Sequence, residues 1–199
     1  AVLGHYAERG NLLSRDATER KACCRCLARA LEIAGILGSE AVLLHPGQLT
    51  AEGTYGQAWD DLTGALRDMA PVAAQHRAAI AVENVWNKFM LSSREAGQLV
   101  DEVGSDWVGI YLDTANMMAF GFPEHWIRDL GARIKKVHLK DFVRRDRSWV
   151  DLMDGDTDWP TVMTELRATG YDGTLIHEVG GDRAKQIEMA ERMRRIVAA

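Results

Sequence analysis

The sequence lacks the apolar stretch of about 20 residues that is needed to cross a bilayer. Residues 1–10 also lack the basic start and the long apolar run of a secretory signal. Cysteine is scarce, and Cys23, Cys24 and Cys26 stand too close together for a disulfide framework, with no second cluster to complete a zinc site. We therefore expect no membrane partner and a reducing, cytoplasmic location.

An excess of positive charge is also missing. The 24 Lys and Arg residues are interspersed with 29 Asp and Glu residues, which gives a net charge of −5 and argues against a nucleic-acid partner. Repeats, low-complexity tracts and linker-like runs do not occur. With 199 residues, of which 47% are hydrophobic, the chain can bury one core, so we predict a single domain over residues 1–199.

Five short apolar runs are present, and each ends on a residue that can bind a metal ion or move a proton. Each run is rich in Val, Ile, Leu or Ala and is followed by a turn or by polar residues, which is typical of a buried parallel strand. The runs are residues 41–45, 79–83, 108–113, 134–138 and 174–178, and they end on His45, Glu83, Asp113, His138 and Glu178.

Stretches with helical periodicity lie between these runs. They predict helices over residues 16–37, 55–76 and 92–103, a short helix after Pro123, and helices that begin at Asp158 and near Asp182. Ser92 and Glu95 have the spacing of a capping box. The segment 142–157 is the one long loop, which is either a substrate-contacting lid or a solvated connection.

The alternation of strand and helix predicts an α/β fold of the (β/α)8 TIM-barrel type. A complete barrel has eight strands in about 250 residues. Five strands are clear here, and a sixth short one is expected at residues 1–4. We therefore expect a barrel that lacks its first strand–helix units.

Parallel strands that close into a barrel bring their carboxyl ends to one rim, where such barrels carry their chemistry. Glu83, Asp113, His138 and Glu178 are therefore expected to converge. This oxygen- and nitrogen-rich set suits Mn²⁺, Mg²⁺ or Co²⁺ and tolerates Zn²⁺. A Lewis acid there would stabilise an enediolate while one Glu removes the proton beside a carbonyl and the other returns it.

Simpler roles exist for each of these residues. Glu83 or Glu178 could be a salt-bridge partner, and Asp113 could cap the turn that follows it. Lys140 alternates with His138 and so points the same way, where it would contact substrate, or it pairs with Asp141. Trp86 either lines a sugar pocket or packs in the core, and the same choice applies to Phe89.

Four motifs resemble the xylose-isomerase-like TIM-barrel superfamily. They are ENVWNKF at 83–89, YLDTAN at 111–116, KVHLKD at 136–141 and DGDTDW at 154–159. Within it the chain is most similar to the sugar-phosphate isomerases and epimerases, including L-xylulose-5-phosphate 3-epimerase and D-tagatose/D-psicose 3-epimerase. The resemblance extends from about residue 11 to the C-terminus.

This resemblance implies that one divalent metal ion is bound by Glu83, Asp113, His138 and Glu178. Mn²⁺ is the ion that we expect first, ahead of Mg²⁺, Co²⁺ or Zn²⁺. The resemblance also implies that Glu83 and Glu178 exchange the substrate proton on opposite faces through a cis-enediolate. Candidate substrate-binding residues are Asn116, Lys140, Trp86, His45 and Arg144. Asn116 stands where free-ketose 3-epimerases usually have His, which favours a phosphorylated ketose, as does the glycine-rich segment 180–182 before a helix.

The sequence therefore predicts a metal-dependent isomerase or epimerase of a ketose or ketose phosphate. Its expected partner is a small-molecule sugar or sugar phosphate, and one assembly that we consider is a homo-oligomer. Two alternatives stay open at this stage. An inosose-type dehydratase would use the same metal site, and an incomplete barrel without catalytic activity would keep the residues without the reaction.

Overall fold

The computed structural model of the protein describes residues 10–199, so the strand expected at residues 1–4 lies outside the described residues. The chain divides into two compact units, Ala1–Tyr111 and Leu112–Ala199. The division falls inside strand β3 (Val108–Asp113), which runs from one unit into the other. Each unit is described by itself.

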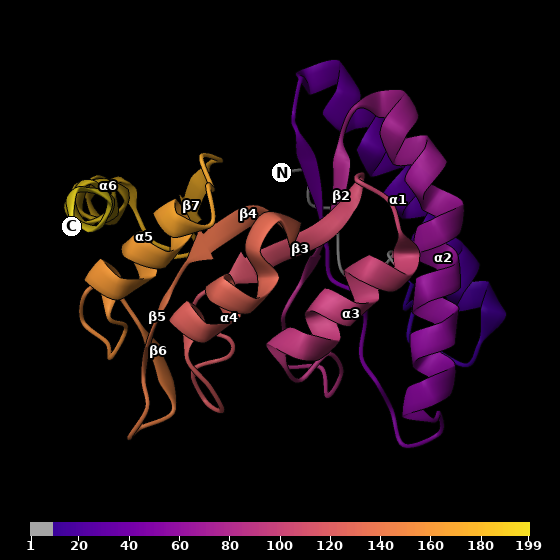
Figure 1. Ribbon diagram of the computed structural model, residues 1–199, viewed down its shortest axis with the longest axis horizontal. Helices are drawn as coiled ribbons and strands as arrows, with labels where there is room; N and C mark the ends of the chain where they lie inside the picture. The colour runs from indigo at the N-terminus through magenta and orange to yellow at the C-terminus, as the bar shows by residue number, and fades with distance from the viewer. Residues whose placement is uncertain (1–9) are drawn as a thin grey trace. The chain divides into compact units, whose positions relative to one another are not determined.

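The first unit alternates helices with parallel strands. Helix α1 (Ala17–Leu37) leads to β1 (Ala41–Leu44), α2 (Tyr55–His76) to β2 (Ala79–Glu83), and α3 (Ser93–Val103) to β3. The strands lie in the order β1-β2-β3, with Ala41 opposite Ala79 and Glu83 opposite Tyr111. Helices α1 and α2 pack side by side (Figure 1). The strands are buried throughout because apolar side chains occupy both of their faces.

Helix boundaries in this unit follow local capping chemistry. The Asp16 carboxylate accepts the Thr18 N–H at the start of α1, and Gly38 ends that helix at φ 67°. Ser92 Oγ accepts the Glu95 N–H at 3.3 Å. The Glu95 carboxylate, however, accepts the Leu91 N–H at 2.6 Å, so the reciprocal half of the expected capping box is made one residue earlier.

The second unit continues the same alternation from the end of β3. It contains α4 (Pro123–Leu130), a 3₁₀ turn η2 (Gly131–Arg133), β4 (Ile134–Leu139), α5 (Trp159–Ala168), β7 (Leu175–His177) and α6 (Arg183–Ala198). Strand β4 pairs in parallel with β7, with Val137 opposite Leu175. Helix α5 packs between α4 and α6 (Figure 1).

The segment 142–157 is more ordered than the loop expected from the sequence. It contains most of an antiparallel hairpin of β5 (Asp141–Val143) and β6 (Ser148–Val150), with Asp141 opposite Val150. The turn between them has Arg147 at φ 52°, a left-handed conformation that is uncommon outside glycine. No glycine, asparagine or proline marks this turn in the sequence, which is why the hairpin is not predicted.

The buried carboxylate of Asp141 holds this segment in place. It accepts the N–H groups of Met153 at 2.9 Å and Gly155 at 3.1 Å, the hydroxyl of Thr157 at 2.6 Å and the indole N–H of Trp159 at 3.3 Å. Gly155 is required here, since a Cβ at this position would lie 2.3 Å from Asp141 Oδ1. One side chain therefore organises the whole connection from β4 to α5.

In residues 10–199 no helix is both long enough and apolar enough to cross a membrane.

Candidate active site

Three of the candidate ligands lie together in the second unit. Asp113 ends β3, His138 lies in β4, and Glu178 follows β7 directly. One ligand atom from each lies within 4.8 Å of the others. Asp113 and His138 are buried, whereas Glu178 is exposed.

Strand register explains why these side chains share one face. The Thr114 N–H donates to the His138 carbonyl at 3.1 Å, which aligns the end of β3 with β4. The Glu178 N–H donates to the Leu139 carbonyl at 3.2 Å, which continues the β4–β7 ladder. Because side chains alternate along a strand, His138 and Lys140 point to the same side.

Asp113 has a capping role in addition to its place in this group. Its Oδ1 atom accepts the N–H groups of Ala115 and Asn116, each at 2.8 Å. These bonds fix the carboxylate on the turn after β3, so the capping role considered from the sequence is present. The Oδ2 atom lies 3.7 Å from the ammonium of Lys140.

Lys140 lies against the acidic members of the group. Its Nζ atom donates to Glu178 Oε2 at 2.8 Å and lies 5.0 Å from the centre of the Trp149 ring. An ion pair with Asp141 was the alternative, but the Asp141 carboxylate binds the segment that follows it. The sequence signals of this anchoring role are the Lys-Asp pair at the strand end and the Asp-Gly-Asp-Thr run after it.

Glu83 lies in the first unit, at the end of β2, with 5% of its surface exposed. The loop after it is fixed by Phe89, which is buried and stacks on Tyr55 with ring centres 5.0 Å apart. The Tyr55 hydroxyl donates to the Glu95 carboxylate at 2.9 Å. The pKa of Tyr55 is raised to about 12, mainly by burial and secondly by this hydrogen bond. Phe89 is therefore a packing residue, whereas Trp86 is 41% exposed.

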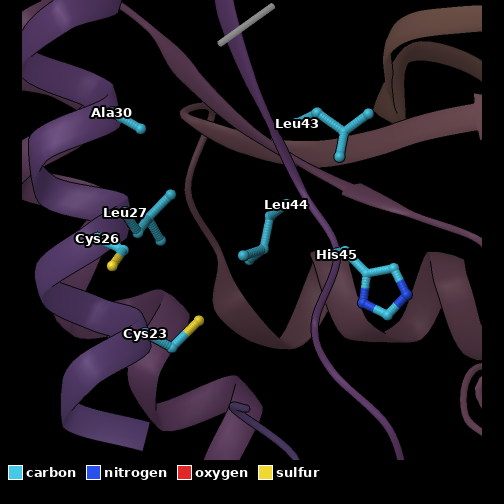
Figure 2. A pocket seen from close by; sticks show the side chains of 7 residues that line it. All are labelled: Cys23, Cys26, Leu27, Ala30, Leu43, Leu44 and His45. Carbon is cyan, nitrogen blue, oxygen red and sulfur yellow. The ribbon is translucent and has the colours of Figure 1, made fainter. Parts of the chain in front are cut away.

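His45 follows β1 in the first unit. Its Nδ1 atom accepts the Gly47 N–H at 3.1 Å, so the ring stabilises the turn after the strand. His45 also lines a small cavity of about 40 Å³ that Cys23, Cys26 and Leu27 of α1 border. Figure 2 shows Leu44 pointing from β1 toward α1 and the His45 ring pointing to the other side of the strand.

Arg144 holds the loop that follows β3. Its Nη1 atom donates to the carbonyls of Met118 at 2.6 Å and Gly121 at 2.9 Å, and its guanidinium lies 4.4 Å from the centre of the Phe122 ring. Its backbone N–H donates to Asp156 at 2.7 Å. Arg144 therefore connects the β5–β6 hairpin to this loop.

The donor set suits a divalent metal ion. Metal–ligand bonds of about 2.0–2.6 Å place neighbouring donors roughly 3–5 Å apart, and the 4.8 Å limit within this group agrees with that spacing. Two carboxylates and one imidazole match Mn²⁺, Co²⁺ or Zn²⁺ better than a soft metal, which would need thiolates. The group is thus a candidate carboxylate–histidine metal site.

Comparison with known proteins identifies the family. The model of the xylose isomerase-like TIM barrel family matches residues 1–197, and the chain belongs to this family. The predicted TIM-barrel fold class and the resemblance to this superfamily are therefore confirmed. Residues 10–199 contain five of the parallel strands of such a barrel.

One curated relative is an uncharacterized protein of Methanocaldococcus jannaschii. It is 24% identical over 173 residues, which cover 83% of this chain and 59% of the relative. The chain therefore spans about three fifths of the length of this relative.

Solved structures with the same fold include sugar epimerases. A D-tagatose 3-epimerase-like protein has a TM-score of 0.84 at 22% identity, covering 94% of this chain and 73% of that one. A D-psicose 3-epimerase has a TM-score of 0.75 at 22% identity, covering 96% and 73%. The IolI protein, solved with a zinc atom, has a TM-score of 0.79 at 18% identity, covering 93% and 72%.

Proposed function

We propose that the protein is a divalent-metal-dependent isomerase or epimerase that acts on a ketose or ketose phosphate. The observation that carries this proposal is the group of Asp113, His138 and Glu178, which lie at or next to the ends of three parallel strands and bring their ligand atoms within 4.8 Å. The fold supports it because sugar epimerases are among the solved structures that share it.

Glu83 is proposed as the fourth ligand. The register of β2 against β3 supports this assignment, because Glu83 lies opposite Tyr111 and Asp113 follows two residues later on the same strand. Since side chains two residues apart point the same way, Glu83 and Asp113 belong to one face of the sheet. Burial of Glu83 at the strand end agrees with a ligand rather than a solvated acid.

The reaction we propose is proton exchange beside a carbonyl. Glu83 and Glu178 hold carboxylates that remove the proton from one face of the sugar and return it on the other. A divalent ion at the site would supply Lewis acidity toward the carbonyl and its neighbouring hydroxyl. We propose Mn²⁺ as this ion, because the set is dominated by carboxylate oxygens.

Substrate contacts are proposed for the five remaining candidates. Lys140 adjoins Glu178, so its ammonium is positioned for a sugar oxygen or a phosphate. The others are Asn116, Trp86, His45 and Arg144. We propose a phosphorylated ketose as the preferred substrate, since glycines 180 and 181 precede the N-terminus of α6.

The test is deuterium incorporation from heavy water with a panel of ketoses and ketose phosphates in the presence of Mn²⁺. Deuterium at C3 with inversion identifies an epimerase, and deuterium at C1 or C2 identifies an isomerase. We expect Glu83→Gln and Glu178→Gln to abolish exchange, because an amide cannot accept the proton, while both variants stay folded. Glu165→Gln, which alters an acid of α5 that pairs with Arg128 of α4, is the matched control.

Metal content of each variant is measured in parallel, since loss of the ion would also abolish exchange. Full exchange by either Gln variant at full metal occupancy would rule out the two-carboxylate mechanism. Loss of water from an inosose would instead identify a dehydratase, and an inert protein would indicate a barrel without activity.

A further inference from the structure

A lysine ammonium lies against two of the residues proposed to hold the metal ion. Lys140 Nζ lies 2.8 Å from Glu178 Oε2 and 3.7 Å from Asp113 Oδ2. Its side chain is 19% exposed and that of Asp113 is fully buried, so solvent screens this pair of charges poorly, whereas the Glu178 side chain is 46% exposed. A divalent ion bound to the same two carboxylates would lie within a few ångströms of this ammonium.

We propose that the Lys140 ammonium competes with the metal ion for the carboxylates of Asp113 and Glu178 and thereby sets the metal affinity of the site. This inference rests on the proposed function, because it takes Asp113 and Glu178 to be metal ligands. The hydrogen bond from the ammonium holds the Glu178 carboxylate beside Asp113 when no ion is bound. A metal ion must then weaken the Lys140–Glu178 bond, which lowers the net affinity and makes the ion exchangeable.

A second partner for the ammonium is available on the β5–β6 hairpin. The Trp149 ring centre lies 5.0 Å from Lys140 Nζ, within the range of about 6 Å for an attraction between a cation and an aromatic face. Trp149 belongs to β6, whose hairpin is fastened by the Asp141 carboxylate. The indole therefore gives the ammonium a second favourable contact besides Glu178.

The surroundings of Lys140 distinguish it from other lysines in the unit. Lys185 also has two carboxylate partners, Asp151 at 2.6 Å and Glu188 at 3.0 Å. Asp151 connects Lys185 of α6 to the segment after β6, Glu188 lies on α6 itself, and neither acid is a proposed metal ligand. Lys185→Met therefore removes the same charge and the same kind of ion pair without altering the candidate site, which makes it a matched control.

The experiment measures Mn²⁺ affinity directly, from the loss of the electron paramagnetic resonance signal of free Mn²⁺. We expect Lys140→Met and Lys140→Gln to bind Mn²⁺ about tenfold more tightly than the native protein, since a positive charge close to the ion is removed. Lys140→Arg keeps the charge and should retain an affinity close to the native value. Lys185→Met should leave the affinity unchanged.

Each other outcome has a definite meaning. Equal or weaker binding by both uncharged Lys140 variants would overturn the inference and leave the proposed reaction standing. An equal gain in Lys185→Met would assign the effect to net charge and would also overturn it. Absence of Mn²⁺ binding in the native protein and in every variant would overturn both this inference and the metal site of the proposed function. Circular dichroism verifies that each variant is folded.

Discussion

At the scale of single residues, the Asp141 carboxylate anchors the segment between β4 and α5. Its two oxygen atoms accept hydrogen bonds from backbone, hydroxyl and indole donors spread over residues 142–159. Bonds to a buried charged acceptor are stronger than neutral ones, and loss of the acceptor leaves donors buried without a partner.

We predict that Asp141→Asn lowers the free energy of unfolding by about 2–4 kcal/mol. The amide has the shape of the carboxylate, but its NH₂ group would face N–H and O–H donors. Urea denaturation monitored by circular dichroism measures the change. Asp146→Asn is the matched control, because Asp146 lies in the exposed turn and pairs with the adjacent Arg145. A loss as small as that of the control would show that the bonds to Asp141 contribute little.

At the scale of secondary-structure elements, α6 is held in the second unit mainly by polar contacts. Its buried residues are Met189 and Ile196. Arg192 pairs with Asp154 at 2.8 Å and donates to the Leu152 carbonyl at 2.5 Å, so the helix is tied to the segment after β6. Lys185 adds a second tie to Asp151. Exposed ion pairs are screened by salt, whereas apolar packing is not.

We predict that Arg192→Met increases amide hydrogen exchange in α6 severalfold, and that 1 M NaCl increases it in the native protein. Exchange in α5, which has four buried residues, should change little. Mass spectrometry of peptides from the two helices provides the measurement. Arg194→Met changes the same residue type two positions away on α6 and serves as the control. Identical exchange in both variants and at both salt concentrations would mean that apolar contacts hold the helix.

The elements also show what can be predicted from this sequence. Residues 55–76 were predicted as one helix and form α2 with the same ends, because Thr54 caps its start and the apolar stripe is regular. The ends of the five strands were predicted to within one residue, because short apolar runs are followed by polar residues. The β5–β6 hairpin was missed, since its strands have three residues each and its turn places Arg147 in a glycine-like conformation.

The sequence predicts only some of the contacts in the candidate site. Convergence of Asp113, His138 and Glu178 follows from their position at strand ends and from the topology of parallel sheets. The contact of Lys140 with Trp149 depends on the hairpin, and so it could not be derived from strand alternation alone. The packing of Phe89 on Tyr55 likewise depends on the path of the loop after β2.

At the scale of the whole molecule, a metal ion bound only by the folded chain would raise its stability by mass action. At a free concentration 100 times the Kd, the gain is about 2.7 kcal/mol. For a chain of this size that corresponds to a Tm increase of about 5–10 °C. The gain depends on the ligands being assembled in the folded state and dispersed along the unfolded chain.

We therefore predict that Mn²⁺ raises the Tm of the native protein in a concentration-dependent way, and that Asp113→Asn removes most of this rise. Differential scanning fluorimetry over a Mn²⁺ titration at constant ionic strength measures it. Asp172→Asn, an acid outside the candidate group, should respond like the native protein. A Tm that rises equally in all three proteins would point to non-specific binding of cations.

The anchoring of residues 141–159 on one carboxylate also determines where the chain can change length. Residues 145–147 are exposed, and the donors to Asp141 lie on either side of them, at Phe142 and from Met153 onward. An insertion in the turn would lengthen the hairpin and leave every bond to Asp141 in register. An insertion between residues 153 and 159 would separate donors that must reach the same two oxygen atoms. We therefore expect the tip of this hairpin, rather than residues 153–159, to be the position at which a longer segment could be grafted.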